Sequence, residues 1–288
     1  AFWSLFKATE LQKTVEESIS QVKAHLKDVQ NFYANGSATN NDVLKVQVQL
    51  SNTELLKIDA DNAVQMSVLA LNNIIGQPIL TQVEAKSEIK FNGYSVPNLQ
   101  SLIDTGFQMR PDVKALQLRI KAGEYGVSMS KAGWYPQINL AANYNFNRPN
   151  SRIMPTRDEF IGTWDVGLNL SMDLWNWMTT SHQTAQAEAT LEQTKLGLSQ
   201  FKDAIILEIS QNYLTLLKSK EKITVSEQTV QQAEENYRVT NEKYKAGTAI
   251  NSDLIDAETA LLQAKINLTS ALVDFELSIA KLEKSIGK

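Results

Sequence analysis

The sequence predicts a mainly α-helical protein of long antiparallel, coiled-coil-like helical hairpins, together with one antiparallel pair of β-strands. Three observations lead to this prediction. Only 12 glycines and 6 prolines interrupt 288 residues, so the regular elements must be long. Residues 1–77 align with residues 212–288 without a gap, which indicates two copies of one unit. Between the copies, two segments alternate strictly between apolar and polar side chains, the period of a β-strand.

Residues 1–77 form the first predicted helical hairpin. Apolar side chains recur at the spacing of an amphipathic helix on both sides of a turn at Gly36. Matching positions of the second copy keep the same register, as in the identical pairs Leu5/Leu216, Tyr33/Tyr244, Gly36/Gly247, Asp42/Asp253 and Leu71/Leu282.

Residues 176–288 contain a long helix and the second hairpin. One apolar or aromatic residue recurs every seventh position, at Ile209, Leu216, Ile223, Val230, Tyr237 and Tyr244. Sustained heptads favour coiled-coil-like pairing, although an ordinary amphipathic bundle shares the pattern. No proline occurs from 180 to 246, and a helix of that length measures roughly 100 Å.

Two further segments precede the strands. Residues 78–110 hold Pro78, Gly93, Pro97 and Gly106, and we interpret them as a connector with short elements. Residues 111–135 are predicted to be a helix that leads to the strands, since a proline suits the first turn of a helix.

The strand pair lies within residues 136–175. Residues 137–147 and 163–174 each place apolar side chains on one face and polar, mostly uncharged ones on the other. About 11 residues per strand is the length that crosses a tilted membrane barrel. Aromatic residues at the expected membrane interface are Trp134, Tyr135, Trp164, Trp175 and Trp177. The alternative is a soluble hairpin whose apolar face packs on a core.

Composition narrows the chemistry. The chain has no cysteine, and its 28 basic and 32 acidic residues leave it mildly acidic, which speaks against nucleic acid as a partner. No motif for catalysis, metal or cofactor binding is present, so we expect a protein that is not an enzyme. The two histidines, His25 and His182, have no neighbouring ligands in the sequence, and we expect both to be solvated.

Several stretches of the chain resemble the TolC-like outer membrane efflux protein family. They are Arg110–Val113, Trp134–Ile138, Met172–Trp177, Tyr244–Thr248 and Asp253–Ala257. The resemblance implies an α-helical barrel in a homotrimer, a transmembrane β-barrel, and a location in the Gram-negative outer membrane with a large periplasmic part. Family members carry a strand pair in each half, whereas residue 1 aligns with Asn212, inside a helix. We therefore expect about a hundred family residues, including a strand pair, to be missing here.

The resemblance also implies sites at the two hairpin turns. The tips Asn35-Gly36-Ser37 and Ala246-Gly247-Thr248 are expected to contact a periplasmic adaptor protein. From the residues alone, each is a helical turn with a glycine cap, and Asn40, Asn41, Asn251 and Ser252 are candidate N-caps of the returning helices.

A gate is expected beside the tips. Asp253 and Asp256 stand at i and i+3 near a helix N-terminus, where acidic residues are favourable in any case. By resemblance they would form carboxylate rings at a constricted entrance, and Tyr244 and Asp42 would hydrogen-bond between hairpins to hold it shut. Ala249 replaces a basic residue usual in that lock.

Two hypotheses of function result. The first is a passive, trimeric outer membrane channel of a tripartite efflux or type I secretion system, joined by the adaptor to an inner membrane transporter of the RND, ABC or MFS type. The second is a soluble helical scaffold or interaction protein with a core β-hairpin.

Overall fold

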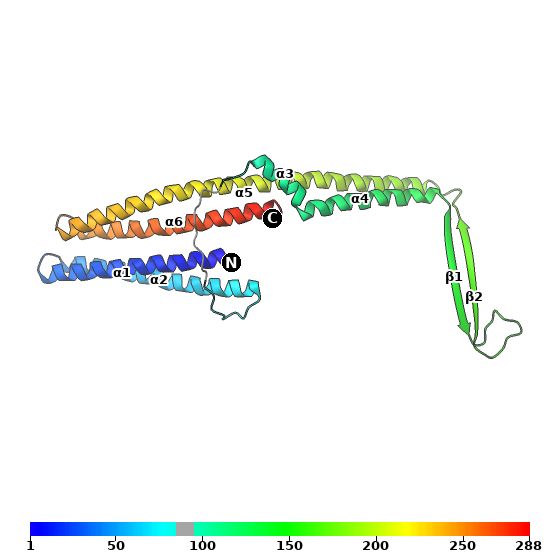
Figure 1. Cartoon of the computed structure of the whole chain (residues 1–288), viewed down its shortest axis with the longest axis horizontal. Helices are drawn as coiled ribbons and strands as arrows, with labels where there is room; N and C mark the ends of the chain where they lie inside the picture. The colour runs from blue at the N-terminus through cyan, green and yellow to red at the C-terminus, as the bar shows by residue number, and fades with distance from the viewer. Residues whose placement is uncertain (85–94) are drawn as a thin grey trace. The chain divides into compact units, whose positions relative to one another are not determined.

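The computed structural model describes residues 1–84 and 95–288 (Figure 1). Part of the predicted connector, residues 85–94, lies outside the described residues. The elements in chain order are α1 (Phe2–Ala34), α2 (Asn40–Ile75), α3 (Leu99–Met109), α4 (Pro111–Lys131), a 3₁₀ turn η1 (Ala132–Trp134), β1 (Gln137–Asn147), β2 (Ile161–Ser171), α5 (Thr179–Lys245) and α6 (Asn251–Ser285). The predicted fold class, mainly α with one antiparallel strand pair, is confirmed.

The chain divides into two compact units. The first comprises Ala1–Gly106 and Ile206–Lys288, and the second comprises Phe107–Ile205. Helix α5 contributes residues to both.

The helices of the first unit form two hairpins that lie side by side, α1 with α2 and the second part of α5 with α6 (Figure 1). Helix α1 contacts both α2 and α6. An apolar cluster joins Val22, Val29, Val43, Val46, Tyr244 and Leu254. Farther along the same two helices, Val15 and Ile19 of α1 pack on Leu262 of α6. The core is therefore a narrow seam between helices and not a central globule.

Within α5, the buried positions repeat with the heptad. Ile209, Leu216 and Ile223 are completely buried. Ser219 lies on the same seam and its hydroxyl is 3.1 Å from that of Ser278 on α6. Small hydroxyl side chains at this point let the two helices approach closely while each hydroxyl keeps a hydrogen-bond partner.

The second unit contains α4, the strand pair and the first part of α5. Helix α4 begins with Pro111, and the Arg110 guanidinium bonds the carboxylate of Asp112 at 2.8 Å. The hydrogen bond from that guanidinium is the main reason why the pKa of Asp112 is lowered. Arg110 also lies 5.9 Å from the ring centre of Phe201 on α5, a cation–π contact that fixes the entry of α4 against α5.

Strands β1 and β2 pair in antiparallel register from Gln137↔Ser171 to Asn147↔Ile161. At an antiparallel rise, 11 residues extend about 36 Å, enough to cross a hydrocarbon layer at the tilt of a barrel strand. Among the described residues, no helix is long and apolar enough to span a membrane.

Replacing Gly247 with alanine should destabilise the second hairpin. Gly247 ends α5 with φ +73°, a left-handed conformation that costs an alanine about 1 kcal/mol or more, although a Cβ there meets nothing within 4 Å. Urea denaturation followed by circular dichroism should show a lower midpoint. The matched control is Gly197→Ala inside α5, also in open space but helical, which should raise stability by about 0.5–1 kcal/mol. Equal shifts of one sign at both positions would contradict this account.

Candidate functional site

The two hairpin tips end in the same turn. The Gly36 N–H donates to the Tyr33 carbonyl at 3.0 Å and the Ser37 N–H to the Phe32 carbonyl at 2.8 Å. In the second tip, Gly247 and Thr248 bond the carbonyls of Tyr244 and Lys243 at 3.0 and 2.9 Å. Both are Schellman motifs with a left-handed glycine. All six tip residues named from the sequence, Asn35, Gly36, Ser37, Ala246, Gly247 and Thr248, are exposed.

A groove lies between the two tips. Its volume is about 430 Å³, and its lining includes Phe32, Asp42, Tyr244, Ile250 and Asn251. Both hairpins therefore contribute to one concave surface at this end of the first unit, with aromatic side chains inside it and exposed polar residues around it.

The N-caps of the returning helices differ from the expectation. Helix α2 is capped by Thr39, whose hydroxyl accepts a hydrogen bond from the Asp42 N–H at 3.2 Å. Helix α6 starts after Ile250, whose N–H donates to the Asp253 carboxylate at 3.4 Å. The candidate caps Asn40, Asn41, Asn251 and Ser252 lie within the helices, so that expectation is wrong. An acid at the third helical position serves both starts.

The carboxylate of Asp42 is hydrogen-bonded within this N-cap. It accepts bonds from the Thr39 N–H at 3.0 Å and the Thr39 hydroxyl at 2.6 Å. These bonds lower the pKa of Asp42, because they stabilise its charged form. Among the described contacts of this chain, the hydrogen bonds of the Asp42 carboxylate go to Thr39 and none goes to Tyr244. A lock between these two side chains therefore remains a prediction.

Tyr244 is buried in the seam. Its ring meets His25 edge-on at 5.2 Å between centroids, and Phe32 likewise at 5.6 Å. Burial first, and then the carboxylates of Asp42, Asp28 and Glu258, together raise the pKa of Tyr244 to about 12. The phenol is therefore neutral at any physiological pH and can act as a hydrogen-bond donor.

Asp253 and Asp256 are exposed in the first turns of α6. Asp256 lines a second groove, of about 460 Å³, together with Leu44, Lys45 and Val48 of α2. Lys45 extends toward α6, and its amine is 3.3 Å from the Ser252 hydroxyl. Neither Asp253 nor Asp256 forms an ion pair with another described residue. The two carboxylates are thus available to charges outside this chain.

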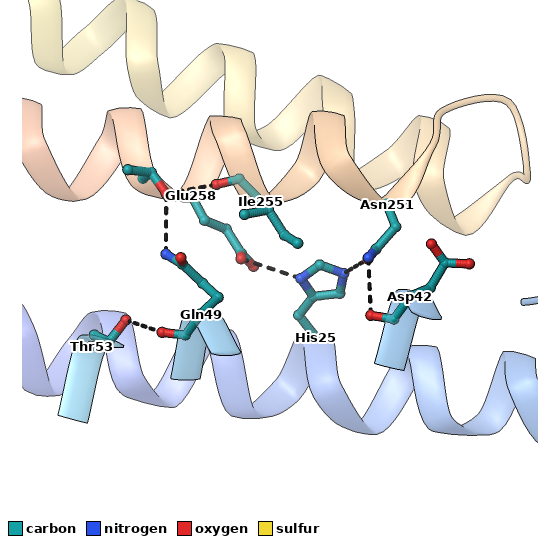
Figure 2. Close-up of polar contacts among 8 residues, drawn as sticks. His25, Asp42, Gln49, Thr53, Asn251, Ile255 and Glu258 are labelled. Atoms are coloured by element: carbon teal, nitrogen blue, oxygen red, sulfur yellow. Dashed lines mark hydrogen bonds and ion pairs between the residues drawn. The ribbon is translucent and has the colours of Figure 1, made fainter. Parts of the chain in front are cut away.

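His25 is not solvated. Its exposed fraction is 4%, and its ring lies between two side chains of α6 (Figure 2). Nδ1 is 3.2 Å from the Glu258 carboxylate and Nε2 is 2.9 Å from Oδ1 of Asn251. The expectation for His25 is therefore wrong, whereas His182 is exposed as expected.

A signal for this arrangement was present in the sequence. His25 lies three residues after Val22 and four before Val29, and Glu258 lies four after Leu254 and three before Leu261. Both polar residues thus occupy seam positions of their helices. Two ionisable residues on facing seams must be paired or neutral. In the described residues, no cluster of three metal-ligating side chains occurs.

The strand pair carries the second candidate surface. Its larger apolar side chains are between 56% and 76% exposed: Ile138, Leu140, Tyr144, Phe146, Trp164, Val166, Leu168 and Leu170. A hairpin in a soluble core would have this face covered, and none of the described residues covers it.

The aromatic residues separate into two groups along the strands. Trp134 and Tyr135 precede β1, and Trp175 and Trp177 follow β2, so all four lie at the end where Gln137 pairs with Ser171. Trp164 is opposite Tyr144, seven residues from Ser171 along β2, about 24 Å at a strand rise. Because barrel strands tilt by about 35–45°, this length corresponds to roughly 18 Å along a membrane normal, which is less than the ~25 Å height of the apolar band of a membrane barrel.

Comparison with known proteins identifies the family. The model of the family described as outer membrane efflux protein matches residues 102–288. The outer membrane protein TolC of Vibrio cholerae is 22% identical over 288 residues, which are 100% of this chain and 66% of that protein. The alkaline protease secretion protein AprF of Pseudomonas aeruginosa is 24% identical over 260 residues, 90% of this chain and 54% of that protein.

A solved structure shows the same fold. The outer membrane protein VceC of Vibrio cholerae superposes with a TM-score of 0.77 at 19% identity, over 99% of this chain and 67% of that one. The chain thus spans between about half and two thirds of the length of the curated relatives it matches. It belongs to the outer membrane efflux protein family, whose place is the Gram-negative outer membrane with a part in the periplasm.

Proposed function

We propose that this chain is part of one subunit of a homotrimeric outer membrane channel, which serves a tripartite efflux system or a type I secretion system. The observation that carries the proposal is the pair of 11-residue strands with an apolar face exposed along its length. Two strands cannot close a barrel. The pair therefore needs further strands beside it, and a ring of identical subunits supplies them.

The opposite face of the strands suits a hydrated lumen. It carries Asn139, Asn143 and Asn145 on β1, and the Asn143 amide donates to Asp165 on β2 at 3.0 Å. Alternation of a lipid-facing and a water-facing side is the pattern of a transmembrane barrel strand. In this proposal the channel is a passive conduit without catalysis, and an inner membrane transporter of the RND, ABC or MFS type supplies the energy.

The tips are proposed as the contact with a periplasmic adaptor protein. Both present exposed backbone turns, and the groove of about 430 Å³ lies between them. A helical hairpin of the adaptor that docks end-on would meet both tips at once. The equal Schellman geometry of the two tips supports a partner that binds similar surfaces on both hairpins.

Asp253 and Asp256 are proposed as the gate carboxylates. Repeated around a threefold axis, these unpaired acids concentrate negative charge at one entrance, which favours cations and binds polyvalent ones. Opening would move the tips away from the axis as the hairpins shift. Tyr244 and Asp42 are proposed to hold the closed position, Tyr244 as a neutral donor.

Neutralising the gate carboxylates should relieve block by polyvalent cations. Asparagine is the informative substitution, because Asp253→Asn retains an oxygen for the Ile250 N–H. In planar bilayers, the full-length protein with Asp253→Asn and Asp256→Asn should require a concentration of cation on the order of tenfold higher for half block. Asp59→Asn, an exposed acid elsewhere on α2, is the control and should leave the block unchanged. An unchanged block in the double variant would refute the gate, and an absence of conductance in the unmodified protein would refute the channel.

The strand pair should lie in lipid. With Trp164 as the sole tryptophan, fluorescence of the reconstituted full-length protein should be strongly quenched by lipids brominated on their acyl chains, because its side chain is 76% exposed on the apolar face. A variant that retains only Trp3 of α1, which lies in the other unit, serves as the matched control and should be quenched little. Equal quenching of the two variants would contradict the membrane placement.

A further inference from the structure

A buried polar network connects the two hairpins near their tips. His25 of α1 lies between Asn251 and Glu258 of α6 (Figure 2). The exposed fractions of the three residues are 4%, 5% and 3%. Val22 and Val29, one turn before and after His25 on α1, and Leu254, between Asn251 and Glu258 on α6, belong to the apolar cluster of this seam. Polar groups in such a place are costly unless every one is hydrogen-bonded.

The orientation of Asn251 is set by the main chain. Its Nδ2 donates to the backbone carbonyl of Asp42 at 3.1 Å. A carbonyl can only accept, so Oδ1 of Asn251 must point the other way, to His25 Nε2 at 2.9 Å. Nε2 must therefore carry a proton and donate it.

The other ring nitrogen faces an acid. Nδ1 is 3.2 Å from Oε2 of Glu258, and a hydrogen bond between them requires a proton on one of the two. With Nε2 already protonated, the His25–Glu258 pair holds one proton more than a neutral imidazole beside a carboxylate. The pair is then either imidazolium and carboxylate or imidazole and carboxylic acid, and both forms satisfy the geometry.

If the His25–Glu258 pair lost its extra proton, one of the two hydrogen bonds of the His25 ring would be lost. If the proton on Nε2 stayed, the lone pair of Nδ1 would face the Glu258 carboxylate. If the proton moved to Nδ1, Nε2 would face Oδ1 of Asn251, whose amide is held by Asp42. The second oxygen of Glu258, Oε1, is buried without a hydrogen-bond partner among the described residues, so a carboxylate without its cation would be poorly compensated.

The surrounding charges act in the same direction. The titratable groups around His25 are Asp28 of α1, Asp42 of α2, Tyr237 and Tyr244 of α5, and Glu258 of α6. Three are carboxylates, and burial together with those carboxylates keeps both phenols neutral. Two cations lie beside these carboxylates: the Lys245 amine is 3.9 Å from Asp28, and the charge of Lys45 acts on Asp42. A net negative environment favours retention of a proton.

We propose that His25, Asn251 and Glu258 form a proton-dependent latch between the two hairpins, closed when the pair holds its extra proton and weakened when the proton leaves. Histidine is the side chain whose charge changes between pH 5 and 8. The closed latch binds one proton more than the separated, hydrated side chains do at neutral pH. Closure is therefore favoured by acid, and contact between the hairpins weakens as the pH rises.

Amide hydrogen exchange of the full chain in detergent tests the latch directly. After correction for intrinsic rates, opening of peptides around His25 and around Asn251–Glu258 should increase at least about tenfold from pH 6 to pH 8, as a one-proton linkage allows. The contact of Val15 and Ile19 with Leu262, between the same two helices but in a cluster that contains no histidine, is the internal control and should change little.

Two glutamine variants give the matched comparison. His25→Gln removes the titrating ring and should make exchange at the latch independent of pH, while His182→Gln, at an exposed histidine of the other unit, should retain the wild-type dependence. Loss of the dependence in both variants, or in neither, would overturn the proposal.

A second measurement needs no variant. The chain has only two histidines, so ¹⁵N-labelled imidazole gives two assignable sets of signals. His25 should report protonation of the His25–Glu258 pair at pH 6 and its loss at higher pH, and the signals of His182, an exposed ring of the other unit, serve as the reference. A His25 ring that keeps one neutral tautomer beside an ionised Glu258 from pH 5.5 to 9 would refute the latch. These readouts do not involve conductance, so their failure leaves the channel proposal untouched.

Discussion

Lateral packing of long helices along narrow apolar seams is the interaction on which the rest of this structure depends. A helix as long as α5, 67 residues, is stabilised in water mainly by the stripe that it buries. Ile209, Leu216 and Ile223 are fully buried at heptad spacing, while their neighbours Leu207 and Leu214 are mostly exposed. Because these seams cover only part of each helix, the remaining surface and the exposed hairpin tips stay accessible to other molecules.

Most of the fold could be predicted from the sequence, because it depends on period and repetition. Alternation over residues 137–147 corresponds to β1, and the stretch without proline from 180 to 246 corresponds to α5 within a residue at each end. Both signals are local and strong. The gapless repeat predicted two equal tips, and the same Schellman bonds occur at Gly36 and Gly247.

The polar chemistry was harder to predict, because it depends on partners distant in the sequence. Asparagine is a common N-cap residue, so the sequence suggested Asn251 as a cap. In the structure its side chain instead forms hydrogen bonds with the main-chain carbonyl of residue 42 and with the ring of His25. Glu258 and His25 are separated by 233 positions. When each helix is considered alone, each of these residues is of a type usually found on a solvated surface. Only the packing of α1 against α6 shows that both residues are buried.

The bond from Asn251 to the carbonyl of residue 42 also bears on how this protein can vary. The acceptor is main chain, so almost any residue at position 42 can supply it. A change at position 42 then requires no compensating change at position 251, and the two positions can diverge independently among relatives. Methods that infer contacts from correlated substitutions would pass over this connection between the hairpins, although it fixes the orientation of the side chain beside His25.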